Sequence, residues 1–123
     1  MFRKITLAAA LAATIFSGSL MAGQATVSFW QYGKTDLYLT NKGSTGTTCQ
    51  LTFYKWSDGS QVGNTIQTGP LAANQTYVLL GNSLPGQTWG SYVISCTGAA
   101  VAHSYYRDSS ETWQITINGG NEF

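Results

Sequence analysis

Apolar and polar side chains alternate over short stretches of this chain, which is the pattern of half-buried β-strands. In the clearest stretch, Cys49, Leu51 and Phe53 share one face, which we assign to the core. Tyr54 and Trp56 share the opposite face. This segment therefore predicts a strand with one buried face and one face that carries aromatic rings.

The same alternation predicts eight strands. They span residues 25–31, 36–40, 47–56, 61–67, 75–80, 89–97, 101–107 and 113–118. Asp58-Gly59 predicts a hairpin turn after the third strand, and Gly69-Pro70 is expected to end the fourth. No stretch has a helical period of useful length. Short strands separated by Gly and Pro turns are typical of an all-β sandwich or barrel.

We therefore expect a single antiparallel β-sandwich of seven to eight strands over residues 26–118. In the first strand, alternation places Val27 and Phe29 on one face and Trp30 on the other. Residues 119–123 have no predicted secondary structure, so we expect a flexible tail.

The first residues have the order of a secretory signal peptide. Two basic residues precede an apolar run over residues 5–16, and small residues follow. This run is shorter than the roughly 18–20 residues that a membrane span requires. We expect residues 1–25 to be removed by cleavage after Ala25, with Ala22 as the alternative position.

The simple leader favours bacterial export. The expected localisation is therefore secreted, periplasmic or at the cell surface, with no membrane span in the mature form. No cysteine follows the leader directly, so a lipid anchor has no acceptor there.

Charge is scarce in this sequence. Only 9% of the residues are charged, against about 25% in an average soluble domain. Loss of Arg3 and Lys4 with the leader leaves four basic residues against five acidic ones, a net charge of −1. Four basic residues are too few to form the basic surface that nucleic-acid binding needs, so this class of function is not expected. The hydrophobic share of 43% is too high for a disordered chain.

Cys49 and Cys96 both lie in the mature part. An even pair of cysteines in a small exported domain usually forms a disulfide. The bridge would join either the two faces of the sandwich or two neighbouring strands. The chain has no CxxC motif and one histidine, which argues against a metal or redox site.

Such a bridge resembles the central disulfide of immunoglobulin-like sandwiches. Ile94, however, stands where those domains place a Tyr two residues before the second cysteine. Four segments are also similar to bacterial extracellular Ig-like modules. They are Leu37–Asn41, Leu51–Tyr54, Leu71–Thr76 and Trp89–Ile94. This resemblance covers about residues 36–107 and implies an Ig-like fold and a surface setting, but no activity.

Catalytic chemistry has little support in the sequence. His103 is the only histidine, and no nucleophile-elbow motif accompanies it. Asp108 and Glu111 lie in a polar loop that lacks the dense oxygen ligands of a calcium-binding loop. We therefore assign no catalytic residue, no metal and no cofactor, and a small hydrolase is the least favoured alternative.

Aromatic side chains are the best candidates for binding. Along a strand, Tyr54 and Trp56 would stand about 7 Å apart, which suits stacking on a sugar or anchoring a protein. Trp30, Tyr32 and either Tyr105 or Tyr106 are predicted to extend this platform. The alternative is that these rings pack between the sheets or pair across strands.

The sequence thus predicts a secreted, non-catalytic protein that acts by binding or by surface assembly. Few charges guard the open edges of the sheets, so self-association or a protein partner is expected there. The main alternative is a carbohydrate-binding module or small lectin that uses the exposed aromatic platform.

Overall fold

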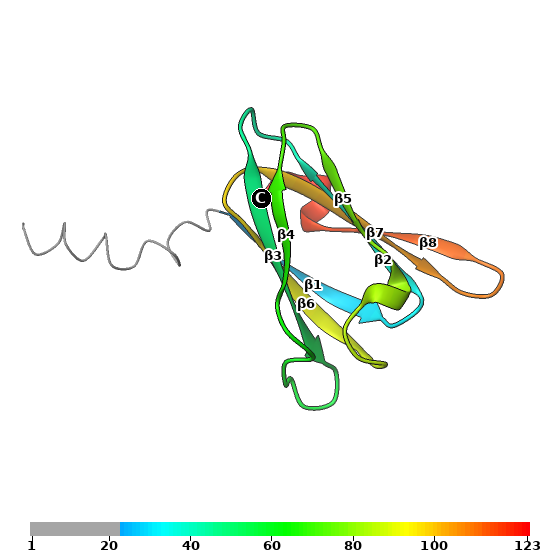
Figure 1. Ribbon diagram of the computed structural model, residues 1–123. Helices are drawn as coiled ribbons and strands as arrows, with labels where there is room; N and C mark the ends of the chain where they lie inside the picture. The colour runs from blue at the N-terminus through cyan, green and yellow to red at the C-terminus, as the bar shows by residue number, and fades with distance from the viewer. Residues whose placement is uncertain (1–22) are drawn as a thin grey trace, which may run out of the picture.

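Eight antiparallel strands form two four-stranded sheets that pack face to face (Figure 1). The computed structural model describes residues 23–123, so most of the predicted signal peptide lies outside the described residues. The elements are β1 (Gly23–Gln31), β2 (Thr35–Asn41), β3 (Thr47–Lys55), β4 (Ile66–Leu71), β5 (Thr76–Leu79), η1 (Gly81–Ser83), β6 (Trp89–Cys96), β7 (Ala100–Arg107), β8 (Thr112–Thr116) and η2 (Asn118–Gly120). Within this part of the chain, no helix is long and apolar enough to cross a membrane. The predicted all-β sandwich is confirmed.

One sheet has the strand order β1-β6-β3-β4, and the other has the order β5-β2-β7-β8. The pairs β2–β5 and β3–β6 correspond to pairs found in immunoglobulin sandwiches. Immunoglobulin domains, however, pair the first strand with the second and the seventh with the sixth. Here β1 pairs with β6 and β7 pairs with β2, so the resemblance holds for the architecture and for part of the strand order.

The core lies between the inner faces of the two sheets. Cys49, Leu51 and Phe53 of β3 are at most 1% exposed, as their alternation predicts. Leu37 and Leu39 of β2 fill the facing side and are equally buried. Apolar burial on this scale is the main source of stability in a small domain.

The disulfide joins neighbouring strands of one sheet. Cys49 and Cys96 are directly paired in the β3–β6 ladder, and their Cα atoms lie 4.1 Å apart. Both residues are fully buried. The predicted bridge is therefore present, in the second of the two arrangements that the sequence allows. It differs from the bridge between sheets in immunoglobulin domains.

A β-bulge in β1 reverses the faces of its last residues. The pairing of β1 with β6 shifts after Val27 and resumes at Trp30, so that Ser28 and Phe29 oppose a single residue of β6. Trp30 therefore points into the core and is 0% exposed, whereas Phe29 is half-buried. The prediction that Phe29 shares the core face of Val27 and that Trp30 lies outside is wrong, because one extra residue changes the parity of the strand.

Trp30 is fixed by hydrogen bonds as well as by packing. Its Nε1 donates to the carbonyl oxygens of Ser91 (3.0 Å) and Tyr54 (3.2 Å). Gly90 pairs with Trp30 across the strands. A side chain at Gly90 would collide with the Tyr54 carbonyl oxygen, which is one of the two acceptors of the Trp30 N–H. The bulge and the glycine thus form one packing unit at the centre of this sheet.

The fourth strand differs from its prediction. β4 spans Ile66–Leu71 and includes Pro70, whereas the sequence pattern predicts a strand over 61–67 that ends at Gly69-Pro70. Gly69 has a φ of 72°, which only glycine adopts readily, and a register shift follows there in the pairing with β3. Because β4 is an edge strand, Pro70 removes no ladder hydrogen bond that a neighbour requires.

The described strands leave four sheet edges, at β1, β4, β5 and β8. The β1 edge is the longest, at nine residues, and carries no charged side chain. Natural proteins usually protect such an edge with charge, Pro or a bulge, and β1 has only the bulge. Self-association through these edges stays a prediction.

The residues of β1 overlap the expected cleavage site of the signal peptide. β1 starts at Gly23, and Ala25 is a core residue with 6% exposure that pairs with Ile94. Cleavage after Ala25 would remove the start of this strand. The position of cleavage, after Ala25 or after Ala22, stays a prediction.

The last residues are part of the fold. Residues 118–120 form η2, and the backbones of Phe123 and Ala100 exchange hydrogen bonds of 3.0 and 3.2 Å. Phe123 also packs against the core. The prediction of a flexible tail without secondary structure is therefore wrong, because a hydrogen-bonded pair and an apolar contact hold the segment.

Two buried hydroxyl groups lack hydrogen-bond partners in the described part of the chain. They are Tyr92 Oη from β6 and Ser104 Oγ from β7. Burial raises the pKa of the Tyr92 hydroxyl. An unpaired buried hydroxyl is costly, since it loses its bonds to water.

We expect Tyr92→Phe to raise the free energy of unfolding at pH 7 by about 1 kcal/mol, because it removes that cost while keeping the ring. It should also flatten the alkaline loss of stability. Above about pH 10 an unfolded tyrosine loses its proton while folded Tyr92 keeps it, so stability falls as pH rises. Urea unfolding at pH 7 and pH 10.5 measures both effects. Tyr105→Phe is the control, and an unchanged pH dependence in Tyr92→Phe would contradict this account.

Candidate functional site

Five aromatic rings form a continuous strip across the molecule, which we call the aromatic strip. Its members are Trp56, Trp89, Phe29, Tyr106 and Trp113. Successive ring centroids lie 4.9, 6.0, 5.4 and 5.4 Å apart in that order. The strip begins beside one sheet and ends on the other.

The strip is exposed. Trp56 is 58% exposed, Trp113 49% and Trp89 40%, while Phe29 and Tyr106 are half-buried. Indole rings are large apolar surfaces that folded proteins usually cover, and an exposed cluster of them marks interaction sites. The aromatic strip is therefore the leading candidate for a binding surface among the described residues.

Each end of the strip is a stacked pair of rings. Trp56 and Trp89 are nearly parallel, with an interplanar angle of 5°, and Tyr106 and Trp113 are tilted by 11°. Phe29 meets Tyr106 edge to face and lies between the two pairs. Stacking covers one face of each ring. The exposure of Trp56 and Trp113 therefore comes from their outer faces and edges.

The backbone holds the strip in place. Trp56 N donates to the Trp89 carbonyl oxygen (3.0 Å), which fixes the residue that follows β3 against the start of β6. Tyr106 and Trp113 are direct cross-strand partners in the β7–β8 ladder. Tyr106 Oη also donates to Gln31 Oε1 (3.1 Å) and so ties this end to β1. The rings therefore keep one arrangement before any ligand arrives.

A shallow groove of about 370 Å³ adjoins the Trp56–Trp89 pair. Its lining consists of Ser28, Lys55, Trp56, Gly59, Trp89, Gly90 and Ser91. Ser28 and Ser91 make no side-chain hydrogen bond to other residues within 23–123, so both hydroxyls are free to bind a ligand. The groove thus combines an aromatic wall, two hydroxyl groups and one ammonium group, with no carboxylate in its lining.

The structure separates the residues predicted for the platform. Trp56 is exposed and belongs to the strip, but Tyr54 is half-buried and makes no ring contact with it. Trp30 lies in the core, so its predicted place in an exposed platform is wrong. Tyr32 packs against the core, and Tyr105 lies on the outer face of the other sheet against Tyr38 and His103. Alternation along one strand cannot show which rings meet across strands.

Three members of the strip were missed by the sequence prediction: Phe29, Trp89 and Trp113. Tyr106, the alternative to Tyr105 in that prediction, is the one that joins the strip. A sequence signal existed for two of them, because Trp89 and Trp113 each begin a predicted strand next to a turn. Rings at such positions are less often buried than rings in the middle of a strand. The signal for Phe29 was hidden by the bulge.

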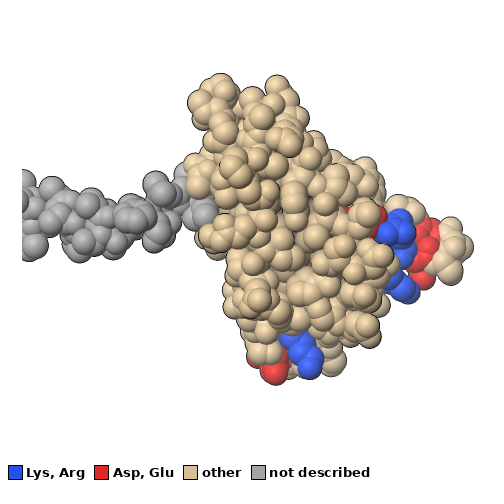
Figure 2. Space-filling view, in the orientation of Figure 1, with Lys and Arg blue, Asp and Glu red and all other residues tan. Residues whose placement is uncertain are grey.

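On the face drawn in Figure 2, charged side chains gather at two separate places on the rim, and the surface between them is uncharged. Asp36 accepts two hydrogen bonds from Arg107 (2.9 and 3.0 Å) and one from the Gly81 backbone N–H (2.8 Å). These contacts raise the pKa of Arg107. Lys34 and Asp108 form a weaker exposed pair at 3.4 Å.

Asp58 and Asp108 both have lowered pKa values. The Ser60 backbone N–H and hydroxyl lower that of Asp58, and the Ser109 backbone N–H followed by Lys34 lowers that of Asp108. Both carboxyl groups are exposed and ionised at neutral pH. Neither has the raised pKa that a general acid requires.

The structure brings no catalytic constellation together around His103. Its ring stacks on Tyr38 at 5.5 Å and meets Tyr105 edge to face at 5.4 Å. Asp108 instead pairs with Lys34 beyond the end of β7. Over residues 23–123, no group of three or more His, Cys, Asp or Glu side chains is placed to hold a metal ion.

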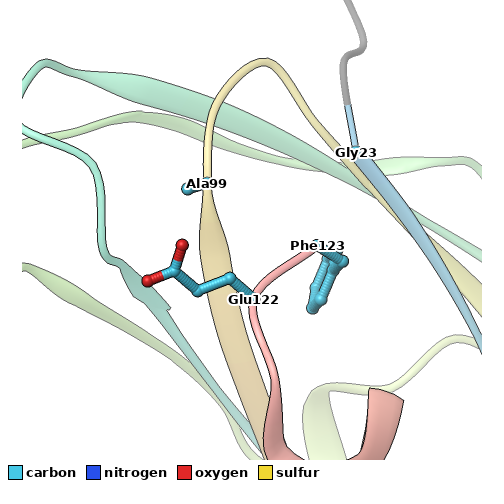
Figure 3. A pocket seen from close by; sticks show the side chains of 4 residues that line it. All are labelled: Gly23, Ala99, Glu122 and Phe123. Atoms are coloured by element: carbon cyan, nitrogen blue, oxygen red, sulfur yellow. The ribbon is translucent and has the colours of Figure 1, made fainter.

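A second hollow, of about 280 Å³, lies where the chain enters β1 (Figure 3). It is lined by Gly23, Ala99, Glu122 and Phe123. The Glu122 side chain points away from Phe123 in this view. One exposed carboxylate without a second functional group offers little chemistry, so we assign no role to this hollow.

Comparison with known proteins identifies no family for this chain. No protein-family model matches the chain, and no curated protein matches it in sequence. Among solved structures, the Anabaena sensory rhodopsin transducer is similar to this chain, with a TM-score of 0.47 and 21% sequence identity. The match covers 64% of this chain and 89% of the transducer.

Proposed function

We propose that this protein is an exported, non-catalytic binding protein whose ligand is a carbohydrate held on the aromatic strip. The observation that carries the proposal is the groove beside the Trp56–Trp89 pair, where indole rings and free hydroxyl groups lie together. A sugar ring has apolar C–H faces that pack on an aromatic ring and hydroxyl groups that need hydrogen-bond partners. This groove offers both kinds of contact.

The shape of the strip favours a carbohydrate over a protein partner. A protein interface has a broad desolvated core in which aromatic anchors are surrounded by other apolar contacts. Beside the strip, the outer face of the β1-β6-β3-β4 sheet carries polar Ser, Thr and Gln side chains. Examples are Ser28, Ser91 and Gln50. A narrow aromatic row next to polar hydroxyls is better suited to a polyol than to a protein surface.

The proposed setting is outside the cytoplasm. The leader pattern supports export, and the buried Cys49–Cys96 disulfide is typical of proteins that fold in an oxidising compartment. The scarcity of charge also suits the proposal, because an uncharged surface does not repel a neutral sugar and imposes little desolvation cost.

Co-sedimentation with insoluble polysaccharides tests this function. The panel is cellulose, chitin, xylan and peptidoglycan, incubated with the purified mature protein. We expect retention on at least one polymer, and Trp56→Ala should weaken it about tenfold or more, as truncation of a central aromatic anchor does. The melting temperature should hardly change, because Trp56 is 58% exposed.

Val78→Ala is the matched control, since Val78 is 44% exposed and lies in β5, at the opposite edge of its sheet from Trp113 in β8. It should bind as the unsubstituted protein does. Absence of binding to every polymer, or equal loss in both variants, would rule out a carbohydrate ligand at the strip.

A further inference from the structure

The aromatic strip has two stacked pairs, and only one of them lines the groove. Trp56 and Trp89 belong to the groove, whereas Tyr106 and Trp113 lie in the β7–β8 hairpin of the opposite sheet. Phe29 lies between the pairs, 6.0 Å from Trp89 and 5.4 Å from Tyr106 by ring centroids. The surface that could contact a ligand is therefore much longer than the groove itself.

We infer that the strip contains two sugar subsites, one at each stacked pair, and that its ligand is a polysaccharide chain that spans both. This inference rests on the proposed function and adds the ligand's polymeric nature. Trp56 forms the open stacking face of the first subsite, and Trp113 forms that of the second, with exposed fractions of 58% and 49%.

The spacing of the rings supports a linear ligand. Four consecutive ring contacts with centroid separations between 4.9 and 6.0 Å leave no break between the subsites. A chain of sugar rings can follow such a row, while a single sugar would leave most of it exposed to water. Hydrogen bonds at Trp56 N and Tyr106 Oη hold both ends in position. The site therefore pays little ordering cost when a chain binds.

The basic side chains near the second subsite are paired within the protein. Arg107 is engaged by Asp36, and Lys34 by Asp108. In the groove, the lining contains Lys55 and no carboxylate. Asp58 lies close enough to Lys55 for the two charges to attract each other. A neutral chain therefore suits the whole strip.

Chain length is the experimental variable that tests the inference. Intrinsic tryptophan fluorescence is titrated with cello-oligosaccharides and with N-acetylchito-oligosaccharides, from the monosaccharide to the hexasaccharide, and with oligogalacturonides as an acidic series. When one chain is long enough to reach both subsites, binding at the first holds the rest of the chain close to the second. The second binding event is then intramolecular, so affinity should rise about 100-fold or more between the short and the long oligosaccharides. A rise in the acidic series alone would contradict the expectation of a neutral chain.

The two tryptophans are then replaced separately. For the hexasaccharide, we expect Trp56→Ala and Trp113→Ala each to weaken binding about tenfold or more. For the disaccharide, Trp113→Ala should change affinity less than about twofold, because the first subsite still binds it. Circular dichroism melting of both variants checks that the fold is retained.

The outcomes separate the two levels of the proposal. Equal affinity for short and long chains, with binding still lost in Trp56→Ala, would overturn the two-subsite inference and leave the proposed function intact. Loss of long-chain binding in Trp56→Ala but not in Trp113→Ala would do the same. Absence of any saccharide binding would overturn both.

Discussion

Replacing Trp30 with alanine is expected to lower the free energy of unfolding by about 3–5 kcal/mol, the range typical of a buried aromatic residue. Trp30 is 0% exposed and packs edge to face on Phe53 with ring centroids 5.2 Å apart. Its indole N–H also satisfies two backbone carbonyl oxygens. The substitution would leave a cavity and remove the donor for these two acceptors. Urea unfolding monitored by far-UV circular dichroism measures the loss.

Trp113→Ala is the matched control for Trp30→Ala. Trp113 is 49% exposed, so its truncation should cost less than about 1 kcal/mol, as most surface substitutions do. Trp30→Phe should give an intermediate cost, because it keeps most of the ring and loses the N–H donor. Equal stability of Trp30→Ala and Trp113→Ala would show that Trp30 is not a core residue and that the bulge in β1 is not formed.

Removal of the disulfide should have an effect of similar size. Cys49 and Cys96 are separated by 47 positions, and in the chain-entropy model a closed loop of this length is worth about 4 kcal/mol of stability. The double variant Cys49→Ala/Cys96→Ala should therefore lose about that amount in urea unfolding. Both cysteines are replaced together, because a single substitution would leave a free thiol in the core.

The unsubstituted protein offers an internal control for this prediction. Because both sulfur atoms are buried, the folded protein should resist dithiothreitol and become reducible only where it unfolds. Protein kept reduced in dithiothreitol, without alkylation, should then match the stability of the double variant to within about 1 kcal/mol. Two free thiols in protein purified from an oxidising compartment, detected by mass under non-reducing conditions, would contradict the presence of the bridge.

Local sequence patterns predict the architecture well because strand alternation reflects burial directly. Residues such as Leu51, Phe53 and Ile94 recur at every second position, and each is buried as its period requires. The positions of most strands follow for the same reason, since Gly and Pro turns interrupt the alternation. The disulfide is predicted from the even pair of cysteines and the expected export of the protein. The sequence leaves open whether it joins the two sheets or two neighbouring strands.

The candidate site was predicted only in part. Trp56 is exposed as expected, but its ring partner is Trp89 from β6 rather than Tyr54 from its own strand. Trp30 and Phe29 exchange faces because of the bulge after Val27. Tyr105 is on a strand face that points away from its neighbour Tyr106, and only Tyr106 joins the strip.

The division between these successes and failures has one physical origin. Alternation along a strand is a property of neighbouring residues, so the sequence alone establishes the all-β class, the buried rows and the low charge of the strand surfaces. A bulge, a strand order and a ring contact across strands depend on the partner strand, and the partner is chosen when the two sheets pack. The aromatic strip draws its rings from β1, β6, β7, β8 and the residue after β3, and packing alone brings them into one row.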